Sequence, residues 1–291
     1  MSLKQPFSWI GSKCRLRGRL YPIFATIPRA LYVEPFGGSG AVFFGKSPEN
    51  SVYNDCNRLL TNFFKVIRNA ANRRMIQELV EITPTSEIYF YEFKTLALQF
   101  MRGEDCAATL DVLNLRDYPA DVAVAFAFFY VQNNCFGGKC CGNFGASYAL
   151  VDPVNDRFLP RSYHANATRL AGFADKLKLT QIICEDWRDV LRDYDAPTTF
   201  FYIDPPYETP TRQDYKTGWD SDDTRDLVAA CLDLKASFVL SCYDGDLYAP
   251  LREIATWQTF KASSSVCRNE HGRGDRVETV YIKNNRQPLL F

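Results

Sequence analysis

Short apolar runs alternate along this chain with segments of helical periodicity. The runs are rich in β-branched and aromatic side chains and predict buried strands over residues 30–33, 51–53, 181–184, 199–203 and 238–241. Helices are predicted over residues 58–80, with Asn57 as the N-cap, and over residues 86–101, 121–132 and 169–179. Ser221-Asp222-Asp223 would begin a further helix. Because strands and helices alternate, we expect an α/β fold with a mostly parallel sheet.

The middle of the chain has little strand character, which divides the sequence into two parts. Residues 1–57 and 175–291 hold the predicted strands, and we expect them to form one domain. Residues 58–174 are expected to form an inserted, mostly helical domain. Within it, the segment near residues 133–148 is rich in Gly, Asn and aromatic residues, which favours a hairpin or an exposed loop.

Composition narrows the class of protein. Hydrophobic residues make up 46% of the 291 positions, which is ample for a sizeable core. No apolar stretch approaches the roughly 20 residues of a membrane span, and no signal core follows the basic amino terminus, so we expect a cytoplasmic protein. Scattered cysteines in such a protein indicate reduced thiols. The cluster of Cys135, Cys140 and Cys141 lacks the spacing and the nearby histidine of a zinc site, so no metal is expected.

One candidate site follows the predicted strand at residues 199–203. Asp204-Pro205-Pro206-Tyr207 would stand at the carboxyl edge of the sheet, where ligands bind in open α/β folds. A carboxylate there can accept a hydrogen bond from an amino group, the prolines restrain the backbone, and the tyrosine offers a flat face for stacking. These residues predict a clamp for the exocyclic amine of a nucleobase.

A second candidate site follows the strand at residues 30–33. Glu34-Pro35-Phe36-Gly37-Gly38-Ser39-Gly40 places glycines where backbone can approach a ligand closely. The spacing is neither GxGxxG nor a phosphate loop. Asn54-Asp55 follows the next strand, where an acid can hold ribose hydroxyls. The pattern favours an adenosine-type cofactor without a phosphate to bind.

Taken in order, these motifs resemble the DNA adenine N6-methyltransferases of the Dam type, the D12 class. The similarity runs nearly from end to end. The stretch from Phe7 to Lys13 resembles the family's amino-terminal cofactor motif, and the segment from Asn54 to Asn57 resembles its ribose-binding segment. Cys184-Glu185-Asp186-Trp187 resembles the segment that holds the cofactor's adenine ring, and Arg276-Val277-Glu278 matches the closing strand.

The resemblance implies a Rossmann-like S-adenosylmethionine-dependent enzyme that methylates N6 of a flipped-out adenine in duplex DNA. Its catalytic residues would be Asp204, Pro205, Pro206 and Tyr207. The cofactor would be bound by residues of all these motifs: Trp9, Gly11, Lys13, Glu34, Pro35, Phe36, Gly37, Gly38, Ser39, Gly40, Asp55, Asp186, Trp187 and Asp204.

The distribution of charge is compatible with a DNA partner. Although the net charge is zero, the residues before Glu34 include six Lys and Arg and no acid. The resemblance also implies that residues 1–57 and 175–291 form the catalytic domain and that the inserted residues 58–174 form a domain that recognises the DNA target. In this inserted domain, Asn133, Asn134, Lys139 and Asn143 have side chains able to contact base edges or phosphates. These four residues and Arg15 are the predicted DNA contacts.

Double-stranded DNA is therefore the expected partner, with no membrane, and a monomer suffices to flip one base. A cognate restriction endonuclease stays open as a second partner. The recognition sequence is also open, because Ser241-Cys242-Tyr243-Asp244 departs from the Ser-Asn-His-Asp pattern of close Dam relatives, and the stretch from Asn133 to Gly138 only loosely resembles the family's DNA-contacting hairpin. Ser12 stands where the family usually has a second glycine, which is a change from one small residue to another. A relative acting on RNA, cytosine N4 or a protein amide and a catalytically silent DNA-binding relative are alternatives. The missing GxGxxG disfavours a nicotinamide oxidoreductase.

Overall fold

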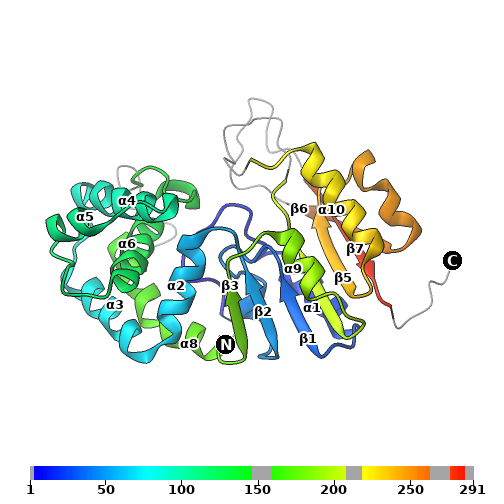
Figure 1. Cartoon of the computed structure of the whole chain (residues 1–291), viewed down its shortest axis with the longest axis horizontal. Coiled ribbons are helices and arrows are strands. Elements are labelled where there is room, and N and C mark those ends of the chain that lie inside the picture. The colour runs from blue at the N-terminus through cyan, green and yellow to red at the C-terminus, as the bar shows by residue number, and fades with distance from the viewer. Residues whose placement is uncertain (1–2, 146–158, 208–217, 263–275, 286–291) are drawn as a thin grey trace. The chain divides into compact units, whose positions relative to one another are not determined.

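The computed structural model describes residues 3–145, 159–207, 218–262 and 276–285 (Figure 1). The chain forms two compact units. The first consists of Met1–Cys14, Gly38–Pro48 and Asp55–Cys184, and the second of Arg15–Gly37, Glu49–Asn54 and Glu185–Phe291. The boundaries differ from the expected ones, since the first 14 residues and part of the glycine loop belong with the helices. The assignment of a catalytic and a target-recognition domain stays a prediction.

The second unit is built on a mostly parallel sheet. Its strands are β1 (Leu31–Glu34), β2 (Ser51–Asn54), β4 (Thr199–Ile203), β5 (Ser237–Cys242), β6 (Thr256–Ala262) and β7 (Arg276–Lys283). They follow one another in the order β2-β1-β4-β5-β7-β6. β1 pairs in parallel with β2 and β4, and β4 pairs in parallel with β5. β7 runs antiparallel between β5 and β6. The predicted α/β class is confirmed.

Helices cover the sheet of the second unit, which explains why its central strands are buried throughout and mostly apolar. Every residue of β4 and β5 is buried. Phe24 of α1 (Arg17–Ala25) packs on the sheet, with its ring centroid 5.1 Å from that of Phe200 and 5.3 Å from that of Tyr202. α9 (Trp187–Asp193) and α10 (Ser221–Asp233) lie side by side (Figure 1), and the 3-10 helix η3 (Asp246–Glu253) packs on α10.

The start of α10 illustrates how a local signal fixes a helix end. α10 begins at Ser221, as predicted, and the residue before it, Asp220, is its N-cap. Its carboxylate accepts from the backbone N–H groups of Asp222 and Asp223, while the Asp223 carboxylate accepts from the N–H of Asp220. This reciprocal arrangement is a capping box. It also places acids in the first turn of the helix, where the helix dipole has its positive end.

The first unit is mostly helical. Its helices are α2 (Arg58–Arg68), α3 (Ala70–Ile82), α4 (Glu87–Arg102), α5 (Ala107–Val112), α6 (Ala120–Asn134), α7 (Leu159–Thr168) and α8 (Leu170–Lys176). It also contains 3-10 helices η1 (Phe43–Gly45) and η2 (Phe136–Gly138), and strand β3 (Thr180–Ile183). α6 contacts α2, α3, α4 and α7, and is buried on all sides from Val122 to Gln132. A helix that is apolar all round belongs at such a centre.

The helix predicted over residues 58–80 is in fact two helices. The expected N-cap is confirmed, because the Asn57 side chain accepts from the N–H of Leu59. Asn69 then interrupts the helix: its backbone is extended, and its side chain accepts from the N–H groups of Ala71 and Asn72 to begin α3. Asparagine offers the backbone this alternative to a continuous helix.

The segment predicted near residues 133–148 begins inside a helix. Asn133 and Asn134 form the last turn of α6, and a single antiparallel bridge joins Cys135 to Phe144 around η2. Residues 146–148 of that prediction lie outside the described part of the chain. None of the helices in that part is both long and apolar enough to cross a membrane.

Candidate active site

The Asp-Pro-Pro-Tyr sequence follows β4 directly, as predicted. Asp204 is half-buried and Pro205 is buried at the carboxyl end of the strand. The chain turns so that the Tyr207 hydroxyl lies 3.0 Å from Oδ1 of Asp204. The catalytic carboxylate and aromatic ring predicted from the sequence are therefore brought together, three residues apart in the chain.

The Tyr207 hydroxyl also makes a short hydrogen bond to Oε1 of Glu278. Glu278 lies on β7 and is only 3% exposed. The pairing of the sheet explains its position: Ile203 of β4 is paired with Leu240 of β5, and Cys242 of β5 is paired with Thr279 of β7. The sequence indicated a closing strand at Glu278 but no role for its side chain.

Tyr207 is held in a restricted and negatively charged environment. Burial raises its pKa well above the ordinary value, and the nearby carboxylates of Asp204 and Glu278 raise it further. Its ring centroid lies 4.4 Å from that of Tyr243, with the two planes tilted by 54°. The phenol therefore stays protonated at neutral pH and remains a hydrogen-bond donor.

The glycine loop, residues 34–40, follows β1, and hydrogen bonds to the end of β2 hold its backbone in place. Glu34 is 1% exposed and accepts a hydrogen bond from the Tyr32 hydroxyl. The Gly37 N–H donates to the backbone oxygen of Asn54, and the Asn54 side chain donates to the oxygen of Pro35. A Cβ on Gly37 would lie 2.2 Å from the Tyr53 ring. Glycine is needed here for a close approach between the loop and β2.

Asn54 also joins the end of β2 to the segment before α9. Its side chain donates to the Glu185 carbonyl at 3.1 Å and accepts from the Glu185 N–H at 2.9 Å. Asn54 thus satisfies three backbone groups of two loops. From the sequence, Asn54 was expected only as part of the ribose-binding segment.

Asp186 and Trp187 lie at the start of α9, beside an aromatic cluster. The Asp186 carboxylate accepts from the Arg188 N–H and so caps the helix. The ring of Phe36 lies 6.0 Å from that of Trp187 and 5.6 Å from that of Trp219, between centroids. Trp219 was not predicted as a site residue. Phe36, Trp187 and Trp219 together form an apolar surface next to a carboxylate.

The remaining cofactor candidates belong to the first unit. Asp55 accepts from the N–H of Gly38 and from that of Asn57, both at 2.8 Å. Burial raises the pKa of Asp55, while these two backbone donors lower it. The acid predicted to hold ribose thus also fixes the glycine loop. The Ser39 hydroxyl donates to Gln5 at 2.9 Å.

The amino-terminal motif of the first unit is partly exposed. Trp9 is half-buried, and its Nε1 would lie 3.4 Å from a Cβ on Gly38. Lys13 donates to the oxygen of Gly11 at 3.1 Å. Gly40 has a φ of 69°, which favours glycine. The cofactor roles of these residues stay predictions.

The predicted DNA contacts occupy very different environments. Asn134 is fully buried, donates to the Tyr130 oxygen at 2.8 Å and accepts from the Thr85 hydroxyl, so its side chain stabilises the helix end and is withdrawn from solvent. This burial argues against the predicted contact of Asn134 with DNA. Asn133 accepts from Asn166 at 2.6 Å.

Three other predicted contacts lie nearer to solvent. Asn143 is exposed and Lys139 is half-buried in the loop of the first unit, while Arg15 is exposed in the second unit. Their contacts with DNA remain predictions.

Comparison with known proteins agrees with this arrangement. The model of the D12 class N6 adenine-specific DNA methyltransferase family matches residues 9–256. The chain belongs to this family. The family predicted from the sequence is thereby confirmed.

Three relatives are between 22% and 25% identical to this chain over the residues that match. It is 25% identical over 207 residues to the DNA N-6-adenine-methyltransferase of Escherichia phage P1, covering 69% of this chain and 24% of that protein. The chain therefore spans about a quarter of the length of the phage relative. It is 25% identical over 242 residues to the Type II methyltransferase M.MjaIII of Methanocaldococcus jannaschii, covering 78% of this chain and 76% of that protein. It is 22% identical over 290 residues to a DNA adenine methylase of Serratia marcescens, covering 94% of this chain and 96% of that protein.

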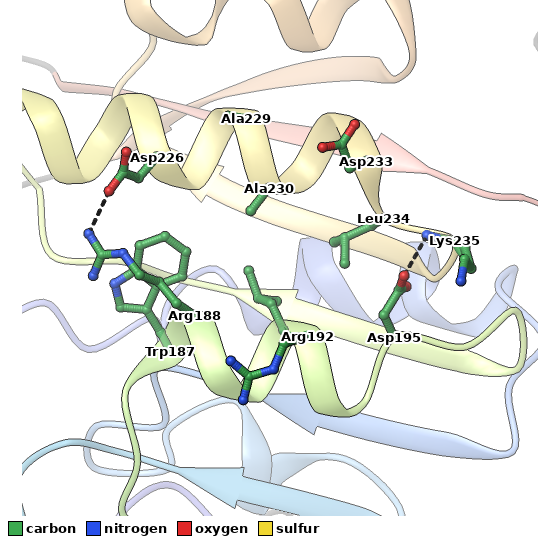
Figure 2. Close-up of a pocket in the computed structure, with 11 residues that line it drawn as sticks. Trp187, Arg188, Arg192, Asp195, Asp226, Ala229, Ala230, Asp233, Leu234 and Lys235 are labelled. Carbon is green, nitrogen blue, oxygen red and sulfur yellow. Dashed lines mark hydrogen bonds and ion pairs between the residues drawn. The ribbon is translucent and has the colours of Figure 1, made fainter.

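A groove of about 560 Å³ lies between α9 and α10 of the D12 methyltransferase (Figure 2). Figure 2 shows Arg188 directed at Asp226, 2.8 Å away, and Asp195 accepting from the Lys235 N–H at 3.1 Å. Its lining comes from these two helices and the turns that follow them, and Asp204 and Tyr207 stand elsewhere. The ion pair joins α9 to α10, and the hydrogen bond joins the segments that follow the two helices.

The cysteine cluster of the D12 methyltransferase lies in the first unit near Asn57. The Asn57 amide donates to Sγ of Cys140 at 3.5 Å, and burial raises the pKa of Cys135 to about 11. Across residues 3–145, 159–207, 218–262 and 276–285, no group of three or more His, Cys, Asp and Glu side chains is arranged to hold a metal ion.

Proposed function

We propose that this protein transfers a methyl group from S-adenosylmethionine to N6 of an adenine flipped out of duplex DNA, at a specific sequence. The observation that supports this proposal is the pairing of Asp204 with Tyr207 at the carboxyl end of β4. Family membership gives the reaction class, and the pairing gives the residues that would carry it out.

The second unit has side chains suited to such a methyl donor. Phe36, Trp187 and Trp219 offer aromatic surfaces to an adenine ring, and Asp186 offers a carboxylate to its amino group. This set of groups suits a ligand without phosphate. When bound, S-adenosylmethionine supplies a methyl group on a sulfonium that is already activated for displacement.

The residues of this chain would mainly position the acceptor nitrogen. Adenine N6 is a poor nucleophile because its lone pair is delocalised into the ring. Hydrogen bonds from its two amino hydrogens to the Asp204 carboxylate and the Pro205 carbonyl favour a pyramidal nitrogen with an exposed lone pair. Tyr207 then supports the base by stacking, and the base must leave the duplex to reach these groups.

We propose the exposed Arg15 and Asn143 and the half-buried Lys139 as contacts to DNA phosphates or base edges. A monomer can flip one base. A DNA substrate also fits the cytoplasmic location expected from the sequence, and a cognate restriction endonuclease is the further partner to be looked for.

The test is methyl transfer by the purified full chain. Radiolabelled S-adenosylmethionine and unmethylated plasmid DNA measure the rate, and long-read sequencing of the product locates N6-methyladenine by sequence context. Asp204→Ala should abolish transfer while near-UV circular dichroism stays unchanged. Asp222→Ala, an exposed acid of the same unit, is the matched control and should keep the wild-type rate.

Two results would contradict the proposal. Full activity in Asp204→Ala would exclude the proposed contact with the amino group. A wild-type protein that binds S-adenosylmethionine but labels RNA, or cytosine, instead of adenine in DNA would exclude the proposed substrate.

A further inference from the structure

Two carboxylates share the hydroxyl of Tyr207. Its oxygen lies 3.0 Å from Asp204 Oδ1 and makes a shorter contact with Glu278 Oε1. A phenol has a single proton to donate. With both carboxylates ionised, the hydroxyl can donate fully to only one of them at a time, so Asp204 and Glu278 compete as acceptors.

This competition matters because Asp204 has another partner during the proposed reaction. To receive the amino group of the base, its carboxylate must be available as an acceptor. A Tyr207 hydroxyl directed at Asp204 would occupy a lone pair and weaken the carboxylate as an acceptor for the amine. A hydroxyl directed at Glu278 would leave that lone pair of Asp204 to the amine.

Glu278 is well placed to be the preferred acceptor. It is 3% exposed and lies on β7, which is paired on both sides, with β5 and with β6. The contact therefore comes from a rigid part of the sheet. Tyr243 packs against the Tyr207 ring 4.4 Å away, between centroids, so the ring is restrained at its hydroxyl and along its side.

We propose that Glu278 is a positioning residue for methyl transfer: by accepting the Tyr207 hydrogen bond, it orients the ring that supports the base and keeps the Asp204 carboxylate available for the amino group. This inference rests on the proposed function. It gives a role in the reaction to a residue near the carboxyl terminus, 71 positions after Tyr207.

The test compares four variants of the full chain: Glu278→Leu, Glu278→Gln, Tyr207→Phe and the double variant Glu278→Leu/Tyr207→Phe. In Glu278→Leu, one of the two acceptors is lost and the hydroxyl is redirected to Asp204. We expect kcat for DNA to fall by about 10–100-fold, the effect of a hydrogen bond to a charged group, with KM for S-adenosylmethionine little changed. Glu278→Gln keeps an acceptor oxygen and should lose less.

The double variant separates positioning from a structural role. Tyr207→Phe keeps the ring for stacking and removes the competing donor, so in the Glu278→Leu background it should recover several-fold of the lost kcat. A merely structural loss at Glu278 would not be restored by a second deletion. The matched control is Glu253→Leu, an exposed glutamate of the same unit, which should keep the wild-type kcat. Circular dichroism melting checks that each variant is folded.

The outcomes distinguish this inference from the proposed function. A wild-type kcat in Glu278→Leu, or additive losses without recovery in the double variant, overturns the role of Glu278 while the methyltransferase assignment stands. A wild-type protein that methylates no DNA adenine overturns the proposed function, and the role of Glu278 with it. Recovery of kcat in the double variant supports both.

Discussion

Replacing Gly40 by alanine should destabilise the first unit for two separate reasons. Gly40 has a φ of 69°, a left-handed conformation that side chains disfavour. A Cβ there would also lie 2.3 Å from Cε2 of Phe44. Phe44 is completely buried, with ring centroids 5.1 Å from Phe64 and 4.9 Å from Phe173, so its ring cannot move aside without disturbing the core.

The two costs can be estimated separately. A left-handed residue with a Cβ costs about 1–2 kcal/mol, and the reduced freedom of the unfolded chain offsets about 0.4–1 kcal/mol of this. Inserting a methyl group into a packed core costs about 1–3 kcal/mol. We therefore expect Gly40→Ala to lower the free energy of unfolding by about 1–5 kcal/mol.

Gly137 provides a matched control in the same unit. Its φ is 70°, but a Cβ there would have open space around it within 4 Å. Gly137→Ala should therefore cost only the backbone term, about 1 kcal/mol. Urea unfolding monitored by circular dichroism measures both variants under one set of conditions. If Gly40→Ala proved no less stable than Gly137→Ala, the contact with Phe44 would be without energetic effect and the reasoning would be refuted.

Three further predictions concern the cap of α10, the pH dependence of stability through Asp55, and the stacking of the DNA base on Tyr207. Asp220→Ala removes the cap of α10 and should lower the free energy of unfolding by about 1 kcal/mol. The control Asp222→Ala should change it by less than about 0.5 kcal/mol. Equal losses of the two variants in urea unfolding would argue against a stabilising cap. Burial raises the folded-state pKa of Asp55, so its contribution to stability is fully present below the unfolded-state pKa of about 4 and is lost as the pH rises through the folded-state value. The stability of the wild type relative to Asp55→Ala should accordingly be greater near pH 4 than near pH 7, and the opposite trend in urea unfolding would show that the two backbone donors outweigh burial. Tyr207→Ala should lower kcat more than the affinity for S-adenosylmethionine measured by calorimetry, and equal losses would count against stacking.

The elements that carry local signals could be predicted from the sequence. The strand at Thr199–Ile203 was predicted with its observed ends, because an uninterrupted apolar run between polar residues leaves a buried strand little freedom. The N-cap at Asn57 was predicted because it depends on one side chain and the N–H two residues later. The pairing of Asp204 with Tyr207 is similarly local, since it spans a single turn.

Other features depended on competition between local alternatives. The apolar periodicity continues across Asn69, so the sequence favoured one helix, whereas the Asn69 side chain satisfies two N–H groups and starts a second. Asn134 stands in a stretch whose Gly, Asn and aromatic content favours an exposed loop. In the structure it ends α6, which lies at the centre of the first unit, and its side chain is buried with that helix. Burial is decided by the packing of helices that are distant in sequence.

The sequence by itself determined the α/β class, the order of the motifs and the residues at the end of β4, because each depends on neighbours within a few positions. Only the tertiary structure decided which distant groups meet them. Glu278 reaches Tyr207 because β7 pairs with β5, which pairs with β4. Trp219, in the segment before α10, meets Phe36 in the loop after β1. Such contacts depend on the order and register of strands, which hydrogen bonds between distant segments set and which no local pattern encodes.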